Sequence, residues 1–428
     1  MEFLFNIFLL ALIFIKLPPF YFIPIPSPFF VTHTFAKVSI FLILTLIYIF
    51  DSDGIKNIFS KKSTLIKLII FYFLSQSISV IKAGDILLFL KSYQNIISGI
   101  LILILSAYFL KANIKRISKI NLIIYWLGIF LIFLEFVFIF FNHFFIDLIK
   151  NTLQKEVLSA YITDFERGRS SIGLNLEIFI PFFFVFINDS NKVKKNVLSV
   201  LSLLSISFLS ILSNFRIRAV TLAFNVFFSF VFFVKNLKKI LDWKKIVLIT
   251  ITVISAIFIS NNLFSFNIYD RLSLKDEQED VSTIEFRINN GVRSFELFLS
   301  SPFIGIGLGN YSSSNKDLIK FNYSFSKQSK YSQDYAELVR NSPHNVFFHT
   351  LAENGLFGLI SYLLLIFYFI KGDWNMITRS NKNQRTQFGK ACIIGSWSIF
   401  IFMLFNPSHT IFVTGWFWAL RGFRETLI

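Results

Sequence analysis

Charged residues and cysteines are scarce in this chain. Only 16% of its 428 residues are charged, whereas 54% are hydrophobic. Soluble globular domains carry about 25% charged residues, so this balance excludes an ordinary soluble domain and indicates a protein whose main solvent is lipid. The one cysteine, Cys392, excludes a disulfide bond within the chain.

The N-terminal run 1–16 lacks a basic first segment and a small-residue cleavage site. A secretory signal peptide has both features. We therefore expect this run to be a retained membrane span.

Basic residues outnumber acidic ones, and the formal charge is +17. They form short clusters between apolar runs, which is the pattern of cytoplasmic loops in membrane proteins. The charge thus predicts membrane orientation and contact with membrane lipids, and we expect no nucleic-acid partner.

Apolar runs fill most of the chain. A helix that crosses a bilayer needs about 20 mainly apolar residues. The sequence predicts an all-α, polytopic transmembrane bundle of about twelve spans, at 3–22, 34–50, 64–81, 91–110, 121–141, 174–188, 197–213, 219–234, 246–264, 345–370, 391–405 and 408–422.

With twelve spans, every basic cluster falls on the side of the two termini, which the positive-inside rule makes cytoplasmic. The clusters are Lys56, Lys61 and Lys62; Lys111, Lys115, Arg116 and Lys119; Lys192, Lys194 and Lys195; Lys235, Lys238, Lys239, Lys244 and Lys245; Lys371, Arg379, Lys382, Arg385 and Lys390; and Arg421 and Arg424.

The opposite side receives four connections: 17–33, 142–173, the short turn 214–218 and a large loop, 265–344. Connections as long as this last one are usually functional. Its acidic tract has no regular ligand spacing, so we expect a solvated surface and no metal site. We expect part of this loop to be helical and to cover an amphipathic cavity.

The sharpest local signal is the sequence Ser342-Pro343-His344-Asn345 before an apolar run. Ser before Pro predicts a helix start, with His344 in its first turn. The positive end of the helix dipole favours a neutral imidazole that can accept a proton. A histidine that merely anchors the helix at the membrane surface is the equally weighted alternative.

Two glycines follow on the same helix, Gly355 and Gly358. Small residues at this spacing predict close approach of a neighbouring helix. His349 and Glu353 are also polar within this span, and polar residues of this kind can face a cavity.

Arginines collect on the outer side, where orientation does not require them. Guanidinium is the natural two-pronged partner of phosphate, so the set indicates a lipid-linked phosphate or pyrophosphate. Snorkelling to headgroups accounts for one or two of them but not for all. They are Arg167, Arg169, Arg216, Arg218, Arg287 and Arg293.

Three elements together resemble the O-antigen ligase and polymerase superfamily of bacterial membrane glycosyltransferases. His344-Asn345, nine residues and then Gly355 resembles its signature. Arg218 to Leu222 is similar to its arginine-x-x-x-leucine element. Arg287, with Pro302 fifteen residues later and then glycines at 305, 307 and 309, is similar to its loop-entry segment.

The chain departs from the family pattern at Gly291, where the family carries tryptophan. Arg293 therefore competes with Arg287, and Arg216 competes with Arg218. The resemblance implies a catalytic region at 165–370, between N-terminal helices at 1–164 and C-terminal helices at 371–428.

The family implies transfer of a glycan from undecaprenyl pyrophosphate to an acceptor sugar hydroxyl, at the periplasmic face of the bacterial inner membrane, without an obligatory metal or other cofactor. The acceptor is lipid A–core for a ligase, which we favour slightly, or a growing lipid-linked glycan for a polymerase. By resemblance the catalytic residues are His344, Arg218 and Arg287, and the substrate-binding residues are Arg169, Arg216, Arg293 and Asn345.

A polysaccharide flippase or transporter is the alternative from another class. Such proteins are built from repeated halves with broken helices near the midplane. The sequence shows no such repeat, and its polar residues lie near the ends of the predicted spans.

The orientation is testable with reporter fusions. Fusions at residues 120, 240 and 380 should read cytoplasmic, and fusions near 155 and 320 should read external, because the basic clusters lie on the cytoplasmic side. An external reading at 240 would overturn the predicted topology.

Overall fold

The computed structural model describes residues 1–16, 32–61, 63–110, 114–140, 175–187, 193–212, 216–233, 277–314, 343, 345–378, 383–405 and 411–427. Within these ranges the chain is helical and contains no strand, which confirms the all-α prediction.

The helices follow the apolar runs of the sequence. They are α1 (Glu2–Lys16), α2 (Thr32–Phe50), α3 (Ser52–Lys61), α4 (Ser63–Ile78), η2 (Ser79–Lys82), α5 (Ile86–Leu110), α6 (Ile114–Phe140), η3 (Leu176–Phe179), α9 (Ile180–Ile187), α10 (Val193–Leu212), α11 (Arg216–Phe233), α15 (Glu277–Ser300), α16 (Tyr311–Ser314), α19 (Val346–Ile377), α20 (Gln384–Met403) and α21 (Ile411–Glu425).

Four described helical segments are long and apolar enough to cross a membrane: Ser63–Lys82, Ile86–Leu110, Lys115–Val137 and Val346–Ile377. Each predicted span overlaps a described helix except 246–264, which lies outside the described residues. The chain is thus a membrane protein by its helices, and the count of twelve spans stays a prediction, as does the large periplasmic loop. The helix α15 confirms that part of 265–344 is helical.

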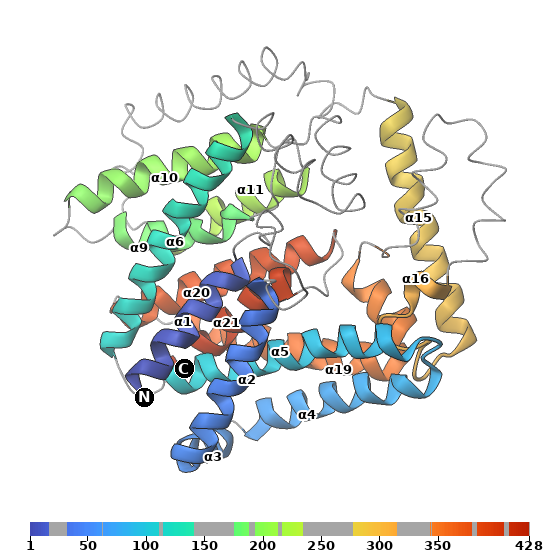
Figure 1. Ribbon diagram of the computed structural model, residues 1–428. Coiled ribbons are helices and arrows are strands. Elements are labelled where there is room, and N and C mark those ends of the chain that lie inside the picture. The colour runs from blue at the N-terminus through green and yellow to red at the C-terminus, as the bar shows by residue number, and fades with distance from the viewer. Residues whose placement is uncertain are drawn as a thin grey trace, which may run out of the picture.

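Three of these spans, α4, α5 and α19, pack side by side, with one helix across their ends. In Figure 1, α4, α5 and α19 run across the lower half of the view, and α15 stands almost perpendicular to them at their right-hand ends. The helix α19 packs against α4 and α15, and α21 packs against α5 and α20. The predicted lid over a cavity is not tested by this arrangement, because much of 265–344 lies outside the described residues.

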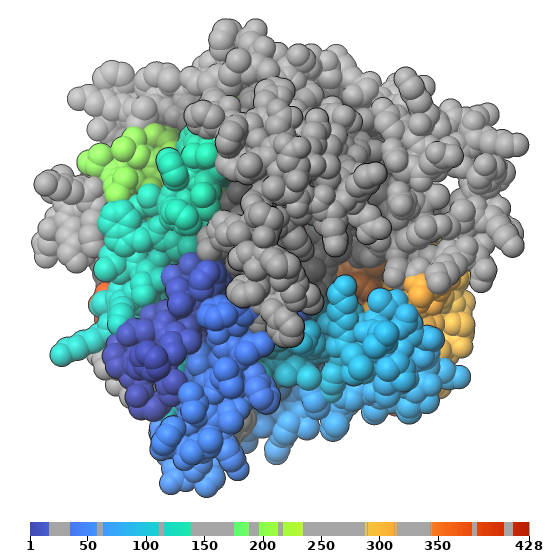
Figure 2. Space-filling view, viewed as in Figure 1, coloured from blue at the N-terminus to red at the C-terminus, as the bar shows by residue number. Residues whose placement is uncertain are grey.

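Phenylalanine occupies both the core and the outer surface. Phe5, Phe8 and Phe109 are fully buried, whereas Phe3 and Phe50 are 73% and 75% exposed. The helices α1 to α6 lie at the surface of the face that Figure 2 shows. An apolar exterior of this kind suits a lipid environment.

The first helix supports the predicted orientation. Glu2, at the start of α1, pairs with Lys119 at 2.9 Å and with Arg116 at 3.6 Å, near the start of α6. The two helix starts therefore lie on the same side of the bundle, as the predicted orientation requires.

Two arginines counted as cytoplasmic loop residues have a different environment. Arg421 and Arg424 lie within α21 and are fully buried. Asp373 of α19 accepts from Arg421 Nη1 at 2.6 Å and lies 2.7 Å from Arg424 Nε. Assigning this pair to a cytoplasmic loop cluster was wrong, because both arginines lie within α21 and their charges are offset inside the bundle.

The helix α19 is broken at Gly355, whose φ of 60° and ψ of −159° are not helical. The segment 302–307 passes through the break and replaces the lost helical bonds. Ile306 N and Gly307 N donate to the carbonyls of Ala352 and Glu353 at 3.1 and 3.0 Å. Backbone groups inside a membrane protein need partners of this kind.

The opposite side of the break is paired as well. Leu356 N and Phe357 N donate to Pro302 O and Phe303 O at 2.8 and 3.1 Å. Gly355 therefore admits this non-helical segment and not a neighbouring helix, which corrects that part of the packing prediction. Gly358 does face a helix, since a Cβ there would lie 3.4 Å from Gln76 Nε2 of α4.

We expect Gly355→Ala to destabilise the protein. A Cβ at this position would lie 2.5 Å from the carbonyl carbon of Phe303, and the backbone conformation is one that only glycine adopts readily. Strain of this kind costs about 1–3 kcal/mol. The melting temperature in detergent, followed by tryptophan fluorescence, should fall.

The matched control is Gly291→Ala in α15, where a Cβ would meet only Phe348 at ordinary contact distances of 3.6 Å and more. Its melting temperature should not fall. Equal melting temperatures for both variants would contradict the strained geometry at Gly355.

Candidate functional site

The helix α19 begins at an asparagine cap. Asn345 has extended φ and ψ, and its Oδ1 accepts from Phe347 N and Phe348 N at 2.9 and 3.2 Å. This cap satisfies helix N–H groups that have no partner within the helix. The prediction of a Ser342 cap with His344 in the first turn was wrong in register, because the chain turns into the helix after Asn345.

Asn345 also joins two helices. Its Nδ2 donates to Leu404 O at 3.1 Å, where α20 ends. His344 itself lies outside the described residues, but its neighbours Pro343 and Asn345 are described. Asn345 therefore fixes the chain directly after His344 to the end of α20.

Arg287 reaches the same place from α15. Its guanidinium lies 5.9 Å from the ring centroid of Phe405, the residue after Leu404. The Arg287 side chain is exposed. The structure thus brings two predicted residues, Arg287 and Asn345, to the end of α20.

Arg293, the competitor of Arg287, contacts the end of α16. Its Nη2 donates to Ser314 O at 2.9 Å, and its Nη1 lies 3.1 Å from Glu296 Oε2. These contacts tie α15 to the end of α16, six residues along from Arg287. Of the two competitors, Arg287 is the one at the end of α20.

Arg218 is buried in an ion-pair cluster. Its Nε lies 2.7 Å from Glu177 Oε1, and its Nη1 pairs with Glu135. Ser210 Oγ donates to the same Glu177 oxygen at 2.5 Å. Arg218 is only 2% exposed, so its charge acts inside the protein and not in open solvent.

Lys16 at the end of α1 completes this cluster. It is 2% exposed and interacts electrostatically with Glu177 and Glu135. Lys16 and Arg218 therefore lie in one buried cluster with Glu135 and Glu177. The sequence prediction of an arginine that faces phosphate did not include these partners, although Glu135 within an apolar run is a signal for such a site.

The remaining predicted arginines are not described at the side-chain level. Arg216 is the first residue of α11, but nothing of its side chain is described. Arg167 and Arg169 lie outside the described residues. The choice between Arg216 and Arg218 therefore stays a prediction.

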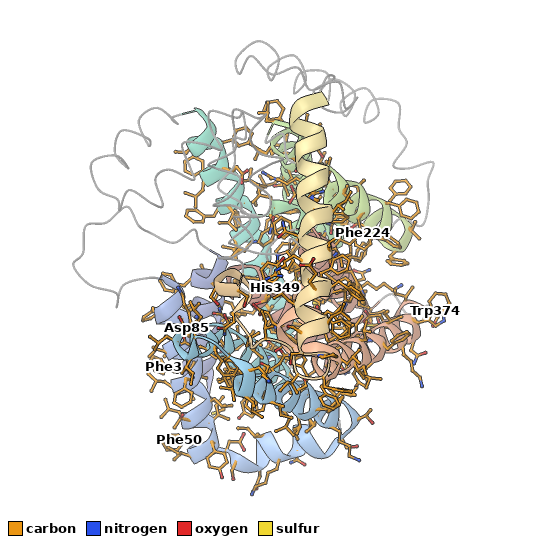
Figure 3. The ribbon with its side chains drawn as sticks, turned by 90° about the vertical axis from the view of Figure 1, so that its right-hand side faces the viewer. Phe3, Phe50, Asp85, Phe224, His349 and Trp374 are labelled. Carbon is orange, nitrogen blue, oxygen red and sulfur yellow. The ribbon has the colours of Figure 1, made fainter. Side chains whose placement is uncertain are left out.

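A second polar group locks α15 to α19. His349 Nε2 lies 3.0 Å from Glu353 Oε1, and the same oxygen accepts from Tyr311 N at 3.1 Å. Tyr311 Oη donates to Asn290 Oδ1 of α15 at 3.1 Å. Figure 3 labels His349 beside α15, and these contacts show what the polar positions within the span do: they fix the helix that carries Arg287.

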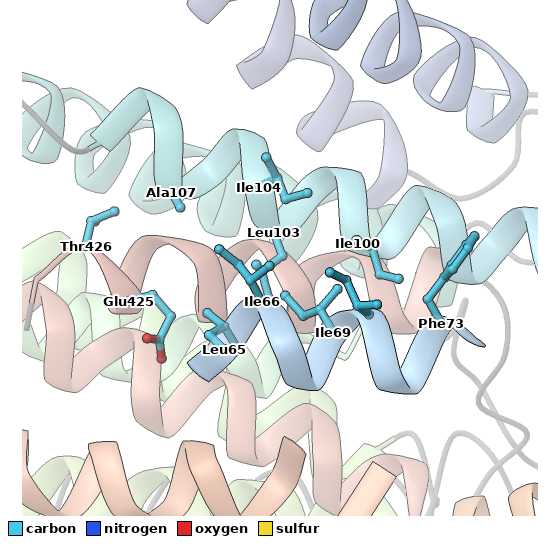
Figure 4. A pocket seen from close by; sticks show the side chains of 11 residues that line it. Leu65, Ile66, Ile69, Phe73, Ile100, Leu103, Ile104, Ala107, Glu425 and Thr426 are labelled. Carbon is cyan, nitrogen blue, oxygen red and sulfur yellow. The ribbon is translucent and has the colours of Figure 1, made fainter. Parts of the chain in front are cut away.

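A separate hollow of about 250 Å³ lies between α4 and α5. Its lining is aliphatic and aromatic except for Glu425 and Thr426 at one end (Figure 4). None of the predicted site residues lines it, so it is no part of the site at the end of α20.

Residues 200–363 match the family model described as O-antigen ligase. No curated protein matches the chain with significant similarity. The matched region contains Arg218, Arg287, Arg293, His344 and Asn345. The match confirms the resemblance to the O-antigen ligase superfamily, and this family indicates a glycosyltransferase-like membrane enzyme of surface polysaccharide synthesis.

We expect Arg218→Ala to lower stability as well as activity. Removing the guanidinium leaves Glu135 and Glu177 buried without it, and breaking a buried ion pair in this way costs about 3–5 kcal/mol. Denaturation of the purified protein in micelles measures the cost.

The control is the double variant Arg218→Ala with Glu135→Gln, which removes one of the two opposing charges. It should recover part of the lost stability. A double variant that is less stable than Arg218→Ala would contradict the ion-pair account.

Proposed function

We propose that this chain transfers a glycan from undecaprenyl pyrophosphate to an acceptor sugar hydroxyl at the periplasmic face of the bacterial inner membrane. The observation that carries the proposal is the meeting of Arg287 and Asn345 at Leu404 and Phe405. Asn345 directly follows His344 in the chain, and Arg287, His344 and Asn345 all lie in the region that matches the O-antigen ligase family.

The acceptor oxygen attacks C1 of the first sugar of the donor, and the bond from C1 to the pyrophosphate oxygen breaks. Negative charge then grows on the leaving pyrophosphate. The exposed guanidinium of Arg287 is the group that stabilises this charge, because it lies on a helix that packs against α19 and offers two parallel N–H donors.

The acceptor hydroxyl loses its proton as it attacks. His344 is the base in this proposal, and the resulting displacement inverts the configuration at C1. His344 directly precedes Asn345, the cap of α19, in the chain. Asn345 holds the backbone at this point through its bond to Leu404 O.

Arg218 acts in this proposal as a positioned hydrogen-bond donor and not as a net positive charge. Glu135 and Glu177 already offset its charge. Arg169 and Arg216 remain proposed phosphate ligands by resemblance, and Arg293 becomes a residue that supports α15.

The acceptor distinguishes a ligase from a polymerase. We propose the ligase, with lipid A–core as acceptor, because the single His344-Asn345 signature and the Arg218 element resemble that branch. Lipopolysaccharide from a deletion strain tests this choice: loss of attachment with long lipid-linked chains indicates a ligase, whereas single-repeat products indicate a polymerase.

The transporter alternative gains one feature, the break in α19. Broken helices of transporters use their unpaired backbone groups to bind substrates or ions. At Gly355 the amides and carbonyls that flank the break are paired with 302–307. The break therefore serves the fold, and the transferase remains the better proposal.

His344 and Arg287 variants test the chemistry. His344→Ala and Arg287→Ala should each reduce transfer by about 10²–10³, the usual cost of losing one transition-state partner. Arg287→Lys should be nearly as damaging, because lysine keeps the charge but loses the two-pronged contact. Transfer of radiolabelled lipid-linked glycan in isolated membranes measures each rate.

Two comparisons sharpen this test. Arg293→Lys should retain most activity, since it alters a bracing contact that is partly exposed. His344→Gln keeps hydrogen bonding but cannot accept the proton, so near-normal activity in that variant would eliminate the base. Normal activity in both alanine variants would sink the proposed site.

A further inference from the structure

The helix α15 exposes apolar side chains and buries polar ones. Ile288, Val292, Phe295 and Leu299, at intervals of four, three and four, are 51–59% exposed. On the opposite side of the helix, Asn290 and Ser294 are buried against the protein. A helix that faced water would show the reverse arrangement.

The exposed stripe continues onto the outer surface of a span. The ring of Phe303, which is 62% exposed, lies 6.1 Å from the ring of Phe357 in α19. Phe357 begins a second exposed row on α19, which continues through Ile360, Leu364 and Phe367. This row belongs to a segment that is long and apolar enough to cross a membrane, so it is a lipid-facing surface.

The direction of α15 fits a helix at a membrane surface. The spans α4, α5 and α19 define the direction across the membrane, and α15 lies across their ends in both views (Figures 1 and 3). A helix parallel to the surface with one apolar side buries that side in lipid at the level of the headgroups.

We infer that α15 lies in the membrane surface at the end of the bundle where α19 begins, with Ile288, Val292, Phe295 and Leu299 in lipid. The occupant of this surface is the acyl-chain region of the adjoining leaflet. Continuity with the lipid-facing row of α19 favours lipid over a second protein.

The consequence concerns Arg287, one residue before the stripe. An arginine beside a lipid-immersed stripe extends its charged end to headgroup depth. This is the depth of a phosphate or pyrophosphate attached to a lipid. The placement of α15 rests on its apolar stripe, and only the use of this depth for a lipid-linked donor rests on the proposed function.

Site-directed fluorescence quenching in nanodiscs tests the placement. Because Cys392 is the one native cysteine, Cys392→Ala gives a background in which Val292→Cys or Leu299→Cys takes a single bimane label. Glu296→Cys is the control, since Glu296 lies on the same helix and its side chain is 53% exposed on the polar flank.

We expect a nitroxide on the acyl chain near the headgroup to quench labels at 292 and 299 several-fold more than the label at 296. Aqueous iodide should quench them in the reverse order. Iodide quenching at 292 and 299 equal to that at 296 would overturn the inference. Protection of both sites from both quenchers would also overturn it, because a protein would then cover the stripe.

The same labels in a His344→Ala background separate this inference from the proposed function. Their quenching should be unchanged, because the placement does not require catalysis. Loss of transfer with normal quenching leaves the placement intact, and normal transfer with water-exposed labels rejects the placement alone.

Discussion

The segment 302–307 pairs its backbone with both sides of the break in α19, and this pairing holds together the end of the bundle where α19 begins. A break in a membrane helix leaves amides and carbonyls that lipid does not satisfy, and each such group costs several kcal/mol. Here the partners come from the connection that follows α15. The segment 302–307 thus offsets the free-energy cost of the break, and it can do so only from one position. Because this segment directly follows α15, it fixes the position of α15 as well.

The same connection reaches the turn between α4 and α5. Asn310 Oδ1 accepts from Asp85 N at 2.7 Å, and Leu308 N donates to Ser79 Oγ at 3.2 Å. Glu353 then adds its bond to Tyr311 N. The spans α4, α5 and α19 and the surface helix α15 therefore form one hydrogen-bonded unit at the end of the bundle where the candidate site lies.

Apolar run length predicted the helices well, because each helix must hide its own backbone from lipid. It failed where tertiary contacts decide. The start of α19 shifted to Asn345 because that side chain also bonds Leu404 O, a partner 59 residues away that local spacing cannot reveal. Likewise, no sequence spacing pairs Arg218 with Glu135, 83 residues before it.

A positive residue near the end of a span can mark the cytoplasmic side or form a buried ion pair, and the sequence alone did not distinguish these two roles. A positive residue near the end of a span marks the cytoplasmic side only when it meets water or headgroups. Arg421 stacks on Trp397 and Phe369 and pairs with Asp373, so it is a structural residue. The acidic residues inside apolar runs, Asp373 and Glu135, are the signal that distinguishes such buried arginines from topology signals.

The difference between buried and exposed arginines also suggests different roles for the arginines of the candidate site. Arg218 and Arg421 are buried beside acidic side chains, and Arg287 lies at the protein surface close to Phe405, directly after α20. A transfer reaction needs a charge that the substrate can reach. The structural frame that holds this charge must be rigid, because a misplacement of about 1 Å can lower the rate by about 10². In the proposed reaction, the paired break in α19, the contact of Glu353 with Tyr311 and the cap at Asn345 supply that frame, and Arg287 supplies the charge.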